Sequence, residues 1–421
     1  MDGYMEKGSG DHTCKTSVIG GIKWKKVYIR TFGCTYNLAD SQKLGQVLEH
    51  QQCTIVNDPD QADVVIVNTC TVIGSTERKV LREIRALCHL TLYVTGCMAV
   101  VQKDVILSVC NARFIHPEEI QAAYREVGTF ARRPVGILQA CHGCRGSCSY
   151  CITRQARGPL VSGGREEIVR QVRGMAGQGV VEIQLTGQDV SAWGMDTGSE
   201  LGVLLSDINC IPGNFMVRVG MMNPATLYPI QESVAGAFRG SKVFSMIHLP
   251  VQSGSDAILG MMKRGYKRDQ VLAIVGRFRE LCPDISLYTD VICGYPGETE
   301  EDFEKTIMLI SLMQPDKVNI TRYSQRPGTP ASREKDMPDR FKKERSRALR
   351  IHAEAIARSK NASWLTREVP VLFTEHPRAG SSMGRTANYQ GVVVQGHYVP
   401  GTVRMVRLTE DRIYYFLGDM V

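Results

Sequence analysis

The sequence contains no long hydrophobic run. No apolar stretch approaches the roughly 18 to 20 residues that a membrane-spanning helix needs, and the polar start MDGYMEKGSGDHTCK has no signal-peptide core. Nor is one sign of charge strongly in excess, because a net charge of +8 permits nucleic acid as a partner without requiring it. We therefore expect a cytoplasmic protein with no membrane partner.

Cysteine, by contrast, is not scarce, since the chain has 14 of them. Cytosolic thiols stay reduced, so metal or cluster ligation is a better first interpretation than disulfides. With 43% hydrophobic and 22% charged residues, the composition is that of a globular protein. A length of 421 residues suggests about three domains.

Three predicted strands in the first part of the chain each end in a cysteine. VYIRTFGC closes on Cys34, DVVIVNTC on Cys70 and TLYVTGC on Cys97. Helical stretches at 39–50 and 75–87 separate them, which is the pattern of a parallel sheet with its ligand site beyond the carboxyl ends of the strands. We expect a shared thiol site there. The alternative is that each thiol is an ordinary buried cysteine.

A second series of strands begins after residue 133 and alternates with helical stretches. This alternation predicts a complete or partial α/β barrel whose function resides in the loops after the strands. The six expected strands are VGILQAC, VVEIQLTGQD, FMVRVGMMNP, VFSMIHLPVQSG, ISLYTDVICGYPGE and KVNITRYSQRPGTP.

The loop after the first barrel strand contains CRGSCSYC, with Cys144, Cys148 and Cys151. Zinc sites usually close with a second thiol pair, whereas three thiolates leave one iron of a [4Fe–4S] cluster open. This spacing, with Tyr150 before the last cysteine, resembles the signature of the radical S-adenosylmethionine (SAM) enzymes. The resemblance implies that the open iron binds SAM, and that one electron then cleaves SAM to a 5′-deoxyadenosyl radical.

Later strand ends carry polar residues that are candidates for SAM contact. The resemblance implies a short motif after the second strand that touches the SAM amino group, and Gln188 and Asp189 of LTGQD occupy that place. Arg218 and Gln252 follow at later strand ends. The alternative for Arg218 is an ordinary ion pair with a carboxylate.

Many further motifs resemble the methylthiotransferases, from residue 27 to the end of the chain. The resemblance implies a second [4Fe–4S] cluster on Cys34, Cys70 and Cys97, whose open iron carries sulfur. GMMNP, QRPGTPA and the short ARG loop are most similar to the archaeal and eukaryotic branch, and the lack of a hydrophobic tail favours the archaeal form. The motifs are FGCTYNLADSQ, NTCTV, TERK, TGCMA, CRGSCSYC, ARGPLVSGG, RVGMMNP, HLPVQSGSD, DVICGYPGETEEDF, QRPGTPA and GRTANYQGVVV.

The activity that this resemblance implies is replacement of the C2 hydrogen of N6-threonylcarbamoyladenosine, next to the tRNA anticodon, by a methylthio group. One SAM would supply the methyl group and a second the radical. An electron donor and a sulfur source, both unidentified, would join tRNA as partners. The threonylcarbamoyl group is anionic, so we expect a basic residue in its pocket, with Arg218 or Arg322 as candidates.

Three alternatives to this function stay open from the sequence. Two are related enzymes, acting on isopentenyladenosine in tRNA or on an aspartate of a ribosomal protein. The third is a non-enzymatic zinc or iron–sulfur protein that binds RNA.

The sequence changes character from about residue 362 to short strands separated by turns: VPVLFTEH, YQGVVVQG, GTVRMVRLTE and RIYYFLGDMV. They predict a small β-barrel that resembles the RNA-binding TRAM domain. Arg385, Asn388 and Tyr389 are candidates for RNA contact, although Asn388 and Tyr389 could instead only shape a turn. The basic helix at 341–365 presents either a solvated face or a second RNA-facing surface.

The chain as a whole is therefore expected to be an α/β protein in four parts. They are a disordered tail over 1–24, a parallel α/β domain over 25–127, a partial (β/α)6 barrel over 134–361 and the small β-barrel over 362–421.

Overall fold

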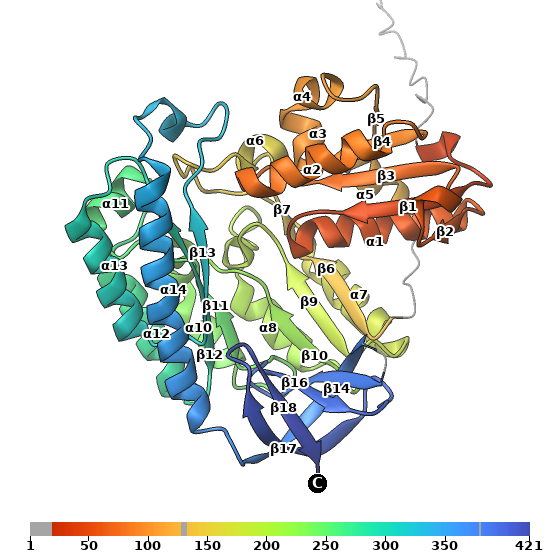
Figure 1. Cartoon of the computed structure of the whole chain (residues 1–421). Coiled ribbons are helices and arrows are strands. Elements are labelled where there is room, and N and C mark those ends of the chain that lie inside the picture. The colour runs from red at the N-terminus through yellow and green to blue at the C-terminus, as the bar shows by residue number, and fades with distance from the viewer. Residues whose placement is uncertain (1–18, 128–132, 379) are drawn as a thin grey trace, which may run out of the picture.

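The computed structural model describes residues 19–127, 133–378 and 380–421 (Figure 1). Its N-terminal part is a sheet of five parallel strands in the order β2-β1-β3-β4-β5. The two short outer strands, β2 and β5, join the three that the sequence predicts. The strands are β1 (Lys26–Thr31), β2 (Thr54–Val56), β3 (Val64–Thr69), β4 (Leu92–Gly96) and β5 (Arg113–Phe114).

Helices cover both faces of this sheet because its central strands are apolar on both sides. One face packs against α1 (Thr35–His50) and α5 (Pro117–Val127), and the other against α2 (Gly74–Leu87), α3 (Cys97–Val101) and α4 (Lys103–Leu107). The helices α1 and α2 confirm the two predicted helical stretches.

Residues 19–24, which the sequence assigns to a disordered tail, are part of the described fold. Ile19 and Ile22 are fully buried in the core beneath α1 and α5, and a short 3-10 turn spans Ile19–Gly21. The prediction was wrong for this segment because two isolated isoleucines give no periodic pattern that a sequence can show. Residues 1–18 lie outside the described residues.

The six predicted barrel strands are all present. They form two parallel sheets, β6-β9-β10 and β11-β12-β13, which single bridges join at Val217–Val243 and Met221–His248. In the described chain β6 and β13 are the two free edges, so the barrel is partial, as expected. The strands are β6 (Val135–Gln139), β9 (Glu182–Thr186), β10 (Met216–Val219), β11 (Met246–His248), β12 (Ser286–Cys293) and β13 (Lys317–Arg322).

A ring of helices packs outside these strands and shares one large apolar core with them. The long helix α14 runs along the outside of the barrel beside α13 (Figure 1). Its Leu349 and Ala353 enter the core, and its Arg345 forms a buried ion pair with Glu298 at 2.7 Å. The longer helices of the ring are α7 (Arg165–Gly177), α8 (Leu201–Asn209), α10 (Gln231–Ala237), α12 (Arg268–Leu281), α13 (Glu300–Met313) and α14 (Asp339–Ala362).

The last part of the chain is a closed five-stranded barrel in the order β14-β15-β16-β18-β17. The sequence predicts four of these strands and misses β15, because SSMGR lacks an apolar alternation. Figure 1 places this barrel at the opposite end of the α/β barrel from the N-terminal sheet. The strands are β14 (Glu368–Arg378), β15 (Ser381–Arg385), β16 (Gly391–Gln395), β17 (Val403–Asp411) and β18 (Tyr415–Met420).

Candidate functional site

The loop after β6 brings together the three cysteines of CRGSCSYC. The backbone N–H of Gly146 donates a hydrogen bond to Cys144 Sγ at 3.2 Å, and that of Thr153 donates to Cys151 Sγ at 3.4 Å. Burial raises the pKa of the Cys144 thiol to about 11. Donors aimed at sulfur stabilise a thiolate ligand, so the loop suits metal ligation in place of free reactive thiols.

Cys148, the third cysteine of the loop, faces a buried arginine. Arg264 donates to Cys148 Sγ at 3.1 Å, and its other terminal nitrogen donates to the Pro250 carbonyl at 3.0 Å and to Asn223 Oδ1 at 3.2 Å. These contacts hold a permanent positive charge beside one ligand position. Sequence reasoning missed Arg264 because it lies in a turn far along the chain, with no motif that links it to the loop.

The LTGQD segment after β9 offers one free polar atom at the strand end. Gln188 Oε1 is buried and has no hydrogen-bond partner among the described residues. Asp189 differs, since its carboxylate accepts hydrogen bonds from Ser191 Oγ at 2.7 Å and Thr226 Oγ1 at 2.8 Å. Of the two residues, Gln188 has the acceptor that a bound amino group would satisfy.

The other predicted SAM contacts lie in different surroundings. Tyr150 packs edge-on against Tyr295, with ring centroids 6.5 Å apart. Gln252 adopts φ +67° and hydrogen-bonds through its backbone to β12. Arg218 lies over the ring of Tyr389 at 5.5 Å, which places its guanidinium toward the C-terminal barrel.

The three strand-terminal cysteines of the N-terminal sheet converge at its carboxyl edge. Cys34 precedes α1, Cys70 follows β3 and Cys97 begins α3. A Cβ on Gly33, which has φ +109°, would lie only 2.7 Å from the Cβ of Cys70, so these two turns touch. Burial, with the neighbouring Cys97 and Cys34 thiols, raises the pKa of Cys70 to about 12.

The thiols are not spaced as ligands of a single ion. Within the described ranges, no three His, Cys, Asp or Glu side chains are close enough to hold one metal ion. An iron–sulfur cluster differs in this respect, because each cysteine binds a separate iron of the cluster.

The carboxyl edge of the N-terminal sheet faces the barrel loops, as Figure 1 shows for α3 and α6 (Thr153–Arg157). A buried arginine from the loop after β13 fixes this arrangement. Arg326 donates to the Thr71 carbonyl at 3.1 Å and forms an ion pair with Glu77. The N–H of Gly74 donates to Ser324 Oγ at 3.3 Å in the same interface.

The predicted RNA-contacting residues lie in the interface between the two barrels. Tyr389 has φ +66°, and its hydroxyl donates to the buried Glu182 carboxylate at 2.6 Å. Arg385 lies over the Tyr389 ring at 4.9 Å, and Asn388 donates to the Asp284 carbonyl at 3.2 Å. RNA contact by these side chains stays a prediction. In this conformation they contact other residues of the protein.

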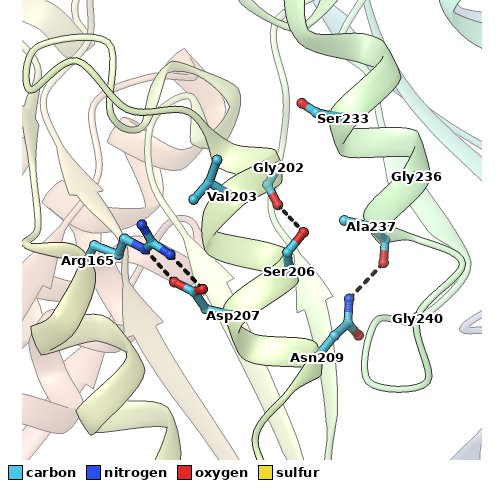
Figure 2. Close-up of a pocket in the computed structure, with 10 residues that line it drawn as sticks. All are labelled: Arg165, Gly202, Val203, Ser206, Asp207, Asn209, Ser233, Gly236, Ala237 and Gly240. Atoms are coloured by element: carbon cyan, nitrogen blue, oxygen red, sulfur yellow. Dashed lines mark hydrogen bonds and ion pairs between the residues drawn. The ribbon is translucent and has the colours of Figure 1, made fainter.

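A surface hollow of about 580 Å³ lies outside the strands, between α8, α10 and the start of α7 (Figure 2). Small side chains line most of it, and an Arg165–Asp207 ion pair closes one side. None of its lining residues is a cysteine or a predicted site residue. The hollow is therefore separate from the thiol sites.

Comparisons with known proteins agree with the fold and with the thiol loop. Residues 138–310 match the model of the radical SAM superfamily, and residues 26–115 match the uncharacterised protein family UPF0004. A solved radical SAM methyltransferase from Kitasatospora setae superposes with a TM-score of 0.52 at 15% identity, covering 73% of this chain and 76% of that one. The fold and the loop therefore define a radical SAM enzyme.

Full-length relatives specify the family. A "probable threonylcarbamoyladenosine tRNA methylthiotransferase" from Methanothermobacter thermautotrophicus is 37% identical, covering 94% of this chain and 99% of its own. A "tRNA-2-methylthio-N(6)-dimethylallyladenosine synthase" from Dictyoglomus thermophilum is 33% identical, over 94% and 98%. A Drosophila melanogaster threonylcarbamoyladenosine enzyme is 33% identical, over 80% and 66%. The chain belongs to the radical SAM methylthiotransferase family.

Among the described residues, no helix has both the length and the apolar character needed to cross a membrane.

Proposed function

We propose that this chain is a tRNA methylthiotransferase that converts N6-threonylcarbamoyladenosine next to the anticodon to its 2-methylthio derivative. The observation that carries the proposal is the placement of two cysteine triads at facing edges of two α/β units. One is Cys144, Cys148 and Cys151, and the other is Cys34, Cys70 and Cys97.

The first triad would hold the [4Fe–4S] cluster that goes with radical SAM enzymes, together with SAM. When bound, these supply the 5′-deoxyadenosyl radical, which can take hydrogen from an unactivated C–H bond such as adenine C2–H. Arg264 and the Gly146 and Thr153 amides would offset the negative charge on the ligand sulfurs. Gln188 Oε1 would accept from the SAM amino group, while Asp189 would hold the loop in shape.

The second triad would hold another [4Fe–4S] cluster and supply the transferred sulfur. Two observations support this assignment. The three cysteines follow strands at the same edge of the sheet, and the turn at Gly33 approaches Cys70 so closely that only a residue without a Cβ fits there. An external electron donor and an external sulfur source would be partners besides tRNA.

In this proposal, two basic residues on barrel strands would bind the anionic threonylcarbamoyl group. Arg218 on β10 lies over the ring of Tyr389, Lys317 on β13 lies over the rings of Tyr288 and Tyr414, and neither makes a hydrogen bond or a close ion pair with any described residue. Burial, with Arg218 and Arg385 nearby, lowers the pKa of Lys317. A bound anion would therefore stabilise the charged form of Lys317. Arg322 alternates to the opposite side of β13, so Arg218 with Lys317 is the better candidate pair.

The nearest alternative is the isopentenyladenosine substrate, because one full-length relative carries a dimethylallyladenosine name. The test is to supply anaerobically reconstituted enzyme with two tRNAs, one carrying threonylcarbamoyladenosine and the other isopentenyladenosine, and to analyse the nucleosides by mass spectrometry. We expect a methylthio product from the first only. Product from the second alone would refute the substrate assignment.

A charge-removing pair of variants sharpens this test. Arg218→Gln and Lys317→Gln should each raise the apparent KM for threonylcarbamoyladenosine tRNA, while SAM cleavage under dithionite without tRNA stays unchanged. Arg322→Gln is the matched control, because it removes an exposed charge from the same strand.

A further inference from the structure

Arg157 connects the two cysteine triads. It is the last residue of α6, shortly after Cys151 in the chain. The next residue, Gly158, has φ +73°, and its carbonyl accepts the N–H of Cys144 at 3.2 Å. The backbone at Arg157 thus belongs to the first thiol loop.

The Arg157 side chain leaves this loop and enters the N-terminal unit. Its Nε donates to Cys97 Sγ at 3.4 Å, and one terminal nitrogen donates to Asn37 Oδ1 at 2.7 Å. The other terminal nitrogen forms an ion pair with Asp40 at 2.8 Å, and the guanidinium lies over the Tyr36 ring at 4.8 Å. Only 3% of the residue is exposed, so the charge is fully desolvated.

Asp40, the counter-ion, is itself held in place. Its Oδ1 accepts hydrogen bonds from Gln121 at 3.0 Å and from Gln139 at 2.8 Å. An ion pair that served only to join two domains would need no contact with sulfur. Here each of the three nitrogens of the Arg157 guanidinium has a polar partner, and Nε is aimed at the predicted ligand Cys97.

We propose that Arg157 is a positioning residue for the cluster on Cys34, Cys70 and Cys97. This inference rests on the proposed function, in which those thiols hold a cluster. Arg157 donates an N–H to the Cys97 ligand sulfur and so favours the reduced, more negative state of the cluster. Because Arg157 follows the other thiol loop directly, it also fixes the position of the two triads relative to each other.

The expected signature is a change in reduction potential. Hydrogen bonds to ligand sulfurs and local charge set the potentials of iron–sulfur clusters. Removing the cation should therefore lower the potential of the N-terminal cluster. Removing the negative charge of Asp40 should raise it, because Arg157 is then left without its counter-ion. General loosening of the interface does not predict shifts of opposite sign.

The experiment uses the full chain with Cys144, Cys148 and Cys151 replaced by alanine, so that one cluster remains. Anaerobically reconstituted protein is titrated with dithionite and followed by electron paramagnetic resonance, with iron content measured in parallel. We expect Arg157→Met to shift the midpoint to a more negative potential and Asp40→Asn to a more positive one. Arg157→Lys, which keeps the charge, should stay nearer the parent value.

Arg326→Met is the matched control. Arg326 is another buried arginine that joins the same two units, but its partners are Thr71 and Glu77, and among the described residues it makes no hydrogen bond to a cysteine sulfur. It should lower thermal stability and shift the potential less than Arg157→Met does.

Different results would separate the two proposals. Unchanged potentials in Arg157→Met and Asp40→Asn, with iron retained, would overturn the role of Arg157. If Arg157→Met holds no iron, the Asp40→Asn variant provides the test. A potential of Asp40→Asn equal to or below the parent value would then overturn the inference. A parent protein without iron would instead refute the second cluster itself.

Discussion

The two cysteine triads are built in different ways. Cys144, Cys148 and Cys151 lie in one short loop, where neighbouring amides and Arg264 surround the sulfurs. The thiols of Cys34, Cys70 and Cys97 come instead from three turns of a parallel sheet. The cation that contacts Cys97, Arg157, comes from another part of the chain.

This difference has a functional consequence. A loop triad needs only its local backbone to be complete, and its ligands do not depend on the N-terminal sheet. A strand-end triad needs the sheet to fold and, by the inference above, the barrel to dock. We therefore expect radical formation to survive damage to the N-terminal triad, and the sulfur-carrying site to be sensitive to damage in both units.

The largest effect is expected for the loop triad. Replacing Cys144, Cys148 and Cys151 by alanine removes the ligands of the iron that would bind SAM. Both 5′-deoxyadenosine and methylthio product should fall to background, measured by liquid chromatography and mass spectrometry of the same reactions. Continued formation of 5′-deoxyadenosine in this variant would place the radical site elsewhere.

A smaller effect is expected at the contact between the two units. Arg326→Met leaves Glu77 and the Thr71 carbonyl without their donor, which should cost about 1–3 kcal/mol, discounted because Glu77 is partly exposed. Urea unfolding followed by fluorescence measures this change. Lys305→Ala is the control, because its ion pair with Glu301 is exposed and should contribute little to stability. Equal midpoints for the two variants would argue against a tightly docked interface.

A still smaller effect separates the C-terminal barrel's interface from its RNA surface. Tyr389→Phe removes the hydrogen bond to buried Glu182, so stability should fall by about 1–2 kcal/mol while tRNA affinity stays unchanged. Arg404→Gln is the converse, because Arg404 is exposed on β17. If it contacts a phosphate, its loss weakens tRNA binding and lowers the salt slope by roughly 0.7 to 0.9, with stability unchanged. The reverse pattern would restore Tyr389 as an RNA contact.

The parts of the site that the sequence predicts well are those with a local pattern. The spacing of CRGSCSYC, and strands that end in Cys34, Cys70 and Cys97, are both visible without coordinates. The six-strand alternation also predicts the barrel correctly, because apolar runs of strand length repeat between helical stretches.

The parts that the sequence does not predict depend on contacts between distant segments. Arg264, Arg326 and Arg157 become recognisable only when folding brings them to a sulfur or a carbonyl. The same holds for Tyr389, whose aromatic ring and hydroxyl suit RNA as well as a protein interface. Its hydrogen bond to Glu182 and its ring contact with Phe244, which place it in a protein interface, are visible only in the structure.

The most direct test of two separate triads is an iron and 5′-deoxyadenosine measurement on the variant with Cys34, Cys70 and Cys97 replaced by alanine. We predict about half the iron of the parent protein, because one of two clusters is lost. Under dithionite the variant should still form 5′-deoxyadenosine, and it should make no methylthio product. Full iron content with normal methylthio product would contradict the two-cluster model.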